Sequence, residues 1–192
     1  MTTEASLRVL LVDGVPERAA EVRAGLEATG CEVVAVAADA TGLTALVRAS
    51  GAEVIVCDID DPSRDALESM HALNRDEPRP VVLFAEKGKP EQIAAALEAG
   101  VAAYVVEGLS PAKVRPVLEV AMLQFRAFQG LRAELDRARA TLAQRETVDA
   151  AKRRLMAEEG LSEPQAHRRM QRLAMERGVK MVELAQAILA RS

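Results

Sequence analysis

The fold of this chain is decided by residues 7–58, LRVLLVDGVPERAAEVRAGLEATGCEVVAVAADATGLTALVRASGAEVIVCD. Three continuous apolar runs predict strands, at residues 7–13, 32–37 and 53–58. None of these runs alternates cleanly between apolar and polar residues, which is typical of strands in a parallel sheet that is covered on both faces. Two segments with a helical spacing of apolar residues separate the runs, at residues 16–29 and 41–50. Gly30 and Gly51 follow these segments and predict where the helices end.

The alternation of strand and helix continues along the chain. Further apolar runs predict strands at residues 80–85 and 102–106, and helical patterns lie at residues 64–74 and 90–99. Five strands with short helical connections predict an α/β fold, a five-stranded parallel sheet with helices on both faces. In such folds, binding sites form at the carboxyl ends of the strands. Asp13 and Asp58 end two of the strands and are therefore candidate site residues.

A long helix is predicted after residue 109. Ser110 suits the position before a helix and Pro111 suits its first turn. Pro116 lies deeper and predicts either a kink or a helix that begins near Val114. Five apolar residues at alternating spacings of three and four form a heptad seam: Phe128, Leu131, Leu135, Ala138 and Leu142. We expect this seam to be buried in the coiled coil of a homodimer; the alternative is that it packs on the sheet of its own chain.

The last segment, residues 151–192, carries three short amphipathic helical patterns that are separated by Gly160 and Gly178. Ser162 followed by Gln165 is a capping-box pattern for the second helix. Seven candidate nucleic-acid contacts lie on the first two helices: Lys152, Arg153, Arg154, His167, Arg168, Arg169 and Arg172. Clustered cations favour phosphate, and the pattern leaves open both DNA, read by a helix in the major groove, and RNA, with His167 stacked on an unpaired base. The alternative is a basic face that is only solvated.

Charge is distributed unevenly along the 192 residues of the chain. Residues 1–112 carry 9 Lys and Arg against 19 Asp and Glu, a net charge of −10, whereas residues 113–192 carry 16 against 10, a net charge of +6. The second part is therefore the better candidate for meeting phosphate. Cys31 and Cys57 lie in apolar runs and are expected to be buried thiols. No apolar run reaches the roughly 18 residues of a membrane span and no signal peptide opens the chain, so we expect a cytoplasmic protein without membrane contact.

The first part resembles the receiver domain of two-component response regulators. Asp58 ends a predicted strand and Pro62 follows it four residues later, as in the receiver phosphoacceptor loop. Asp13 ends the first strand, where receivers carry an acidic pair that holds Mg²⁺, and Tyr104 resembles the receiver switch aromatic. The resemblance covers residues 7–120. It implies a flavodoxin-like fold, Asp58 as the phosphoacceptor, and Asp13 with Asp58 as ligands of Mg²⁺.

Three positions depart from the receiver pattern: Gly14 replaces the second acid, Ala85 replaces the hydroxyl residue that ends the fourth strand, and Glu107 replaces the lysine after the fifth. A hard cation needs several oxygen ligands, so Gly14 weakens the Mg²⁺ site unless Asp60 or Asp61 substitutes. Mg²⁺ is the one cofactor that the pattern leaves open. Phosphoryl transfer needs positive charge at the incoming phosphate, and Glu107 reverses that charge. We therefore expect a pseudo-receiver kept as a protein-docking surface; the alternative is a response regulator activated by phosphorylation of Asp58.

The last part resembles the ANTAR domain. Ten positions carry its pattern of an Ala-Lys start, a Leu-Met pair, Gly-x-Ser-Glu, an Ala before the aromatic position, and a later Ala-Met: Ala151, Lys152, Leu155, Met156, Gly160, Ser162, Glu163, Ala166, Ala174 and Met175. Two positions depart, with Arg153 where the family usually has Gly and His167 where it usually has Tyr or Phe. The whole chain resembles the AmiR/NasT family, and within it the regulators of nitrate and nitrite assimilation. This implies a transcription antiterminator that binds paired stem-loops in leader RNA, and a NasS-like nitrate-sensing protein that holds it inactive.

Together these patterns predict three parts: a pseudo-receiver at residues 1–112, a coiled-coil linker helix at 113–146, and a small all-α, three-helix ANTAR RNA-binding domain at 147–192. The last part has no paired carboxylates in a cleft, no Cys or His ligand set and no nucleophile beside a base. The receiver-like site lacks the lysine and the hydroxyl residue of the receiver pattern. No catalytic residue is therefore assigned, and we expect a binding protein rather than an enzyme.

Overall fold

The computed structural model describes residues 6–60, 62–106 and 111–190. They fall into two compact units, Met1–Phe128 and Gln129–Ser192. The described residues form five strands: β1 (Leu7–Asp13), β2 (Cys31–Ala37), β3 (Val54–Asp58), β4 (Val81–Ala85) and β5 (Ala103–Val106). They also form seven helices: α1 (Pro16–Ala28), α2 (Leu43–Ser50), α3 (Arg64–Asp76), α4 (Pro90–Glu98), α5 (Pro111–Glu159), α6 (Glu163–Arg177) and α7 (Met181–Leu189).

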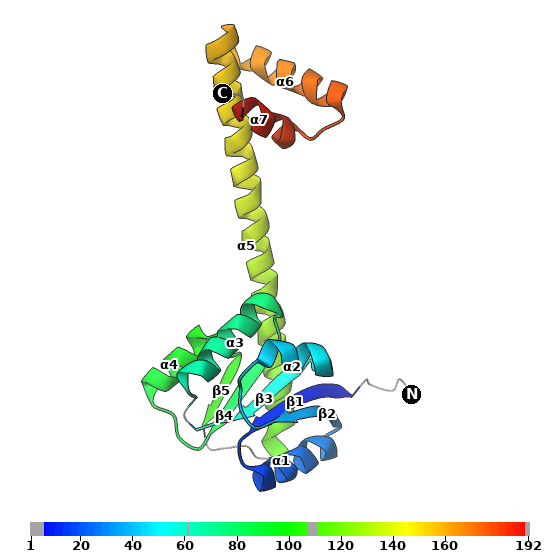
Figure 1. Cartoon of the computed structure of the whole chain (residues 1–192), viewed down its shortest axis with the longest axis vertical. Helices are drawn as coiled ribbons and strands as arrows, with labels where there is room; N and C mark the ends of the chain where they lie inside the picture. Colours follow the sequence, from blue (N-terminus) through cyan, green and yellow to red (C-terminus); the bar gives the residue numbers. More distant parts are fainter. Residues whose placement is uncertain (1–5, 61, 107–110, 191–192) are drawn as a thin grey trace. The chain divides into compact units, whose positions relative to one another are not determined.

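The five strands form one parallel sheet in the order β2-β1-β3-β4-β5, as Figure 1 shows. All five predicted strands are confirmed, with bounds that differ from the prediction by one residue at most. The sheet therefore has the α/β architecture predicted from the sequence. β1 and β3 are neighbours, and their register places Asp13 opposite Asp58. The two acids at the carboxyl ends of these strands consequently lie side by side.

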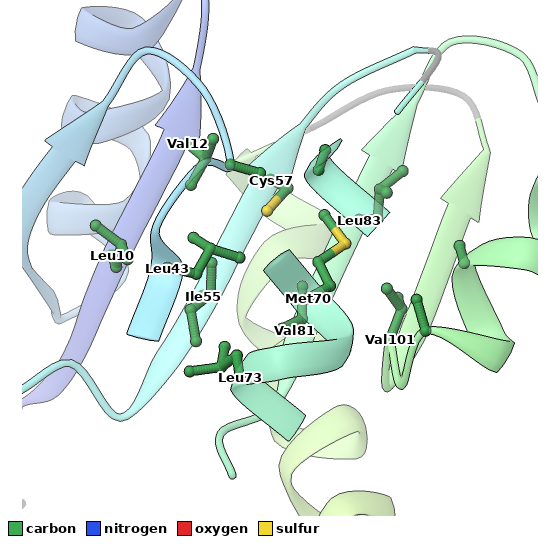
Figure 2. Close-up of a cluster of buried hydrophobic side chains, with 14 of the residues drawn as sticks. Leu10, Val12, Leu43, Ile55, Cys57, Met70, Leu73, Val81, Leu83 and Val101 are labelled. Atoms are coloured by element: carbon green, nitrogen blue, oxygen red, sulfur yellow. The ribbon is translucent and has the colours of Figure 1, made fainter. Parts of the chain in front are cut away.

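Helices cover both faces of the sheet. On one face, α2, α3 and α4 pack over a buried cluster, and Figure 2 shows Leu10 of β1 in this cluster with Leu43 of α2 and Met70 of α3. On the other face, α1 and the first turns of α5 cover a second cluster, which includes Leu11 of β1 and Leu118 of α5. Successive strand residues point to opposite faces, so one apolar strand supplies both clusters. This is why the strands read as unbroken apolar runs.

Both cysteines are buried in the sheet unit as free thiols, as predicted. Cys31 begins β2, and Cys57 precedes Asp58 in β3. Burial, with a smaller effect of the charge on Asp58, raises the pKa of the Cys57 thiol to about 12. A thiol that stays protonated is a poor nucleophile, so Cys57 acts as a packing residue.

The helix α5 contains 49 residues and begins at Pro111. It passes through Pro116 without ending, so the prediction that it begins near Val114 is wrong. The physical reason is packing, because Val114 and Leu118 are buried against the sheet and hold the helix on both sides of the proline. Ser110, its predicted cap, lies outside the described residues. Among the residues that the structure describes, neither α5 nor any other helix has the long apolar run that a membrane crossing requires.

The second unit is a small helical head, made by the end of α5 with α6 and α7. Its core contains Ala151 and Leu155 of α5, Met170 of α6, and Leu184 and Ile188 of α7. The first of the three predicted short helices is therefore not a separate element, because α5 continues without a break to Glu159. The other two helices are confirmed.

The glycines predicted to separate the helices of the head lie where the helices end. Gly160 and Gly178 both adopt a positive φ, of 67° and 64°, which glycine accepts more readily than other residues. The predicted capping of α6 involves Ser162, whose backbone N–H donates to Oε1 of Gln165 over 2.9 Å. This bond satisfies one of the backbone donors that a helix start leaves without a partner.

Candidate functional site

The first candidate site is the acidic pocket at the carboxyl ends of β1 and β3. Asp13 is 3% exposed and Asp58 is 7% exposed, and within the described ranges these are the buried charged residues. The strands bring them together because both acids follow apolar runs that end at the same edge of the sheet. Two ionised carboxylates in such a place repel each other and lose their hydration, so they require a positive partner.

That partner is Arg18, in the first turn of α1. Its Nε and Nη2 donate to the two carboxylate oxygens of Asp13, each over 2.9 Å. Its Nε also lies 3.1 Å from Oδ2 of Asp58. The guanidinium thus bridges both acids, in the two-pronged geometry that arginine makes with carboxylates.

Sequence reasoning missed Arg18. The only signal is an arginine five residues after a strand-ending acid, with a proline at the helix start between them. That spacing places the side chain on the first turn of the helix, from which it folds back over the end of β1.

The pKa of Asp58 is raised by burial, an effect that the charge of Arg18 partly offsets; the neighbouring acids Asp13, Asp60 and Glu86 raise it further. The pKa of Arg18 is raised, chiefly by its hydrogen bond to Asp13, so the guanidinium is charged throughout the physiological range. Arg18 is therefore a permanent counter-ion of the pocket.

The residues of this pocket do not fit the Mg²⁺ ion that receiver domains hold. Arg18 takes both oxygens of Asp13 and faces the carboxylate of Asp58, and Gly14 supplies no carboxylate. Asp60 is turned toward β4, where its Oδ1 accepts a hydrogen bond from the backbone N–H of Glu86 over 2.7 Å. Across residues 6–60, 62–106 and 111–190, no group of three or more His, Cys, Asp or Glu side chains is arranged to hold a metal ion. Asp61, the other predicted substitute, lies outside the described residues.

Of the two switch positions of the receiver pattern that the structure describes, Ala85 departs from the pattern and Tyr104 follows it. Ala85 ends β4 as a fully buried apolar residue, so no hydroxyl is present there to follow a phosphoryl group. Tyr104 is half-buried, with its hydroxyl 3.5 Å from the carbonyl oxygen of Lys87. Glu107 lies outside the described residues.

The second candidate site is the basic head. Its predicted contacts come from two elements, with Lys152, Arg153 and Arg154 on α5 and the other four on α6. Lys152 is only 15% exposed and binds two acids, Asp149 over 2.7 Å and Glu163 over 2.9 Å. These hydrogen bonds, to Asp149 first and Glu163 second, raise the pKa of Lys152. Lys152 therefore ties α5 to α6, a structural role that its charge alone did not indicate.

Arg154 has a similar tie to α7. Its Nε lies 2.6 Å from Oε1 of Glu158, and its Nη1 donates to the carbonyl oxygen of Leu189 over 3.1 Å. That carbonyl is at the carboxyl end of α7, where an arginine stabilises the helix dipole. Lys152 and Arg154 thus connect the three helices of the head.

The remaining basic side chains face solvent to a greater extent. Arg153, His167, Arg168 and Arg172 are exposed, and Arg169 is half-buried. Arg169 lies 3.7 Å from Glu159 and Arg172 lies 3.9 Å from Glu176, both weak surface pairs. The opposite face of α6 is buried through Ala166, Met170 and Ala174, which agrees with the predicted amphipathic pattern. These basic side chains therefore lie on the outer surface of the head.

Two further cations on the head were missed. Arg145 of α5 and Lys180, immediately before α7, line a hollow together with His167. Neither stands in a run of basic residues, so the sequence pattern gave no signal; the three-helix packing brings them together.

The apolar seam of α5 lies open to solvent. In the single chain, Phe128 is 59% exposed, Leu131 66%, Leu135 49% and Leu142 58%. Ala138, the fifth residue of the seam, is exposed as well. These side chains take no part in the core of either unit.

Comparison with known proteins identifies both units. The model of the response regulator receiver domain matches residues 9–119, and the model of the ANTAR domain matches residues 136–189. A curated relative is the transcriptional regulatory protein PdtaR of Mycobacterium tuberculosis, from strains CDC 1551 / Oshkosh and H37Rv. It is 27% identical over 164 residues, which cover 85% of this chain and 80% of the relative.

Solved structures support the receiver fold. The signal receiver domain of the response regulator NarL from Mycobacterium tuberculosis has a TM-score of 0.54 at 25% identity, over 60% of this chain and 96% of that one. A LuxR-family response regulator from Aurantimonas sp. SI85-9A1 has a TM-score of 0.55 at 26% identity, over 62% of this chain and 86% of that one. With the receiver model matching more than half of its length, the chain belongs to the response regulator receiver family, and it carries a carboxyl-terminal ANTAR domain.

Proposed function

We propose that this protein is a transcription antiterminator whose head binds paired stem-loops in leader RNA. The observation that carries the proposal is the compact ANTAR head, on which Arg153, Arg168, Arg172 and His167 are exposed. Guanidinium groups bind phosphate, and an imidazole can stack on an unpaired base. The relative PdtaR is named as a transcriptional regulator, which agrees with this role. The mechanism is binding of RNA, without catalysis.

The seam of α5 supports the proposal of a homodimer. Four large apolar side chains on one helix remain about half exposed or more in the single chain. Pairing two copies of the seam as a coiled coil would bury them, and it would give one molecule two heads for two stem-loops. Linked heads raise the effective concentration for the second binding event.

We further propose that a partner protein gates the head through the pseudo-receiver, without phosphorylation. Arg18 pairs with both Asp13 and Asp58, and Ala85 has no hydroxyl that could respond to a phosphoryl group. A NasS-like nitrate-sensing protein is the partner that the family resemblance implies, with genes of nitrate and nitrite assimilation as the targets. The second candidate function is a regulator activated by phosphorylation of Asp58, which the position of this acid at the end of β3 favours.

Binding measurements test the RNA proposal. The full chain should bind a two-hairpin leader RNA more tightly than random duplex DNA, and its affinity should fall as salt rises. Equal affinity for both nucleic acids would reject the proposal.

Two further measurements separate the modes of control. If a sensor gates the head, adding a NasS-like nitrate-sensing protein should suppress RNA binding, and nitrate should restore it. If phosphorylation gates the head, acetyl phosphate or beryllofluoride should change dimerisation or RNA binding, and Asp58→Asn should abolish the change. We expect the first result and no response in the second experiment.

A further inference from the structure

The head carries a hollow of about 620 Å³ at the meeting point of its three helices. One wall is a stripe of α5 from Thr141 to Lys152, another is His167 on α6, and the third is formed by Lys180 and the first residues of α7. The volume lies within the roughly 300–1,000 Å³ of sites that hold small ligands. The hollow is thus large enough for one nucleotide.

The charge around the hollow favours an anion. Arg145 and Lys180 are exposed, and in the part of the chain that the structure describes no ion pair engages either side chain. The single acid in the lining is Asp149, which is already bound by Lys152 over 2.7 Å. Hydrogen bonding from Lys152 lowers the pKa of Asp149, so this acid stays ionised and is paired with Lys152, which also pairs with Glu163.

The hollow also offers surfaces for a base. Val148 and Met181 are half-buried in its lining, and the imidazole of His167 borders it. Apolar side chains and an imidazole accept the face of a base by stacking, whereas a paired base presents only its edges. Cations on one side and apolar groups on the other match a nucleotide, which has a phosphate at one end and a base at the other.

We infer that this hollow binds one unpaired nucleotide of an RNA loop. The phosphate lies between Arg145 and Lys180, and the base lies against His167, Val148 and Met181. Lys152 acts as a positioning residue, because its bonds to Asp149 and Glu163 hold two walls in place. The inference rests on the proposed RNA-binding function, and it adds a defined subsite with two residues, Arg145 and Lys180, that the basic sequence pattern does not contain.

The test begins with a probe that needs no knowledge of the natural target. The full wild-type chain selects RNAs from a pool of two-hairpin transcripts with randomised loops, and a selected RNA then serves in binding assays. Arg145→Ala and Lys180→Ala should each weaken its binding about fivefold to tenfold and reduce the salt slope by about one phosphate contact. The matched control is Arg139→Ala, an exposed arginine of α5 outside the hollow, which should bind like the wild type.

The base is tested with abasic loop nucleotides. His167→Ala should weaken the intact RNA about fivefold or more, and it should lose this effect when the nucleotide in the hollow lacks its base. An RNA with 4-thiouridine in its loops should cross-link to the wild-type chain at His167 or Met181, which reports contact without any substitution that could disturb folding.

The outcomes separate the two proposals. If the wild-type chain selects no RNA, the proposed function is wrong and the subsite with it. If it selects RNA while Arg145→Ala and Lys180→Ala bind like Arg139→Ala, and cross-links map outside the hollow, the subsite is wrong and the function stands. Weakened binding with a loop cross-link in the hollow supports both.

Discussion

At the scale of single residues, Arg18 is the positive partner of the two buried acids, Asp13 and Asp58. Arg18→Ala leaves Asp13 and Asp58 buried without a positive partner. Breaking a buried ion pair from one side costs about 3–5 kcal/mol. Because the Arg18 side chain is 36% exposed, we expect a smaller loss of about 2 kcal/mol in the free energy of unfolding at neutral pH. Urea denaturation measures this loss.

Arg23→Ala provides the matched control for this experiment. Arg23 lies on the same helix and pairs with Glu27 over 2.8 Å, but both side chains are about half exposed. We expect a loss of at most about 0.5 kcal/mol there. Equal losses for the two variants would contradict the role of Arg18 as the counter-ion.

Asp58→Asn should change how stability depends on pH. Burial raises the pKa of Asp58, so the folded chain binds this proton more tightly than the unfolded chain does. The stability that Asp58 contributes is therefore full below its unfolded pKa of about 3.9, and it is lost as the pH rises through the folded pKa. Asparagine has no proton to lose, so the variant should melt at a higher temperature than the wild type at neutral pH. The difference should vanish in acid.

Asp39→Asn should change the pH dependence of stability in the opposite direction. Hydrogen bonds from Thr41, among them its backbone N–H at 2.7 Å, lower the pKa of Asp39. The contribution of Asp39 is present above its unfolded pKa and is lost as the pH falls through the folded one. The variant should thus be less stable than the wild type at neutral pH and equal to it in acid. Calorimetric melting temperatures across the acidic and neutral range check both signs, and two curves of the same sign would contradict the assignment.

The two acids of the pocket could be predicted from the sequence, whereas their partner could not. Asp13 and Asp58 end apolar runs, and parallel strands bring their carboxyl ends together whatever the loops do. The contact of Arg18 depends on the path of the loop after β1 and on the rotamer of one side chain. Neither of these leaves a periodic pattern in the sequence from which it could be predicted. Lys152 and Arg154 show the same limit, because a sequence shows a cation and not the acid or carbonyl that engages it in three dimensions.

At the scale of elements, the strands were predictable because apolar runs mark segments that are buried on both faces. The bounds of helix α5 were less predictable than those of the strands. Of the two alternatives at Pro116, a kink or a helix that begins near Val114, the later start is wrong, because the packing of Val114 and Leu118 outweighs the usual effect of a proline on a helix. The separation of α5 from the first short helix of the head was wrong, because no glycine or proline ends the helix before Gly160.

The seam of α5 yields a prediction about assembly. Leu131→Glu with Leu135→Glu should convert the proposed dimer into a monomer, because carboxylates replace apolar residues in the coiled-coil interface. Folding should be unaffected, since both side chains are exposed in the single chain. Sedimentation measures the mass, and circular dichroism checks the helix content.

Ala140→Glu is the control for the seam. Ala140 is exposed and follows Ala138 by two residues, so it falls outside the spacing of the seam. This variant should keep the mass of the wild type. A wild-type chain that sediments as a monomer, or a double variant that keeps the wild-type mass, would exclude the coiled coil.

At the scale of the whole molecule, the two parts of the chain carry net charges of opposite sign, which suits them to different partners. The net charge of −10 over residues 1–112 repels RNA, whereas the +6 over residues 113–192 attracts it. A protein partner can therefore meet the first part without competing for the RNA surface. Within the receiver unit, Arg18 already pairs with the two buried acids, Asp13 and Asp58. Control by a partner then requires only that the partner alters access to the head or the pairing of α5.

The pairing of α5 should set the affinity for RNA with two stem-loops. In a dimer, one bound head places the second head near the second hairpin, and such linkage raises apparent affinity by about 10²–10⁴ without any new contact. The Leu131→Glu, Leu135→Glu variant should therefore bind a single hairpin like the wild type, because the head is unchanged, and bind the two-hairpin RNA about a hundredfold more weakly or worse. Titrating both RNAs with both proteins at one salt concentration measures the difference. If the variant loses affinity for the single hairpin as well, the substitutions have reached the head. If it binds both RNAs like the wild type, each head acts alone and the proposed link between dimerisation and antitermination is wrong.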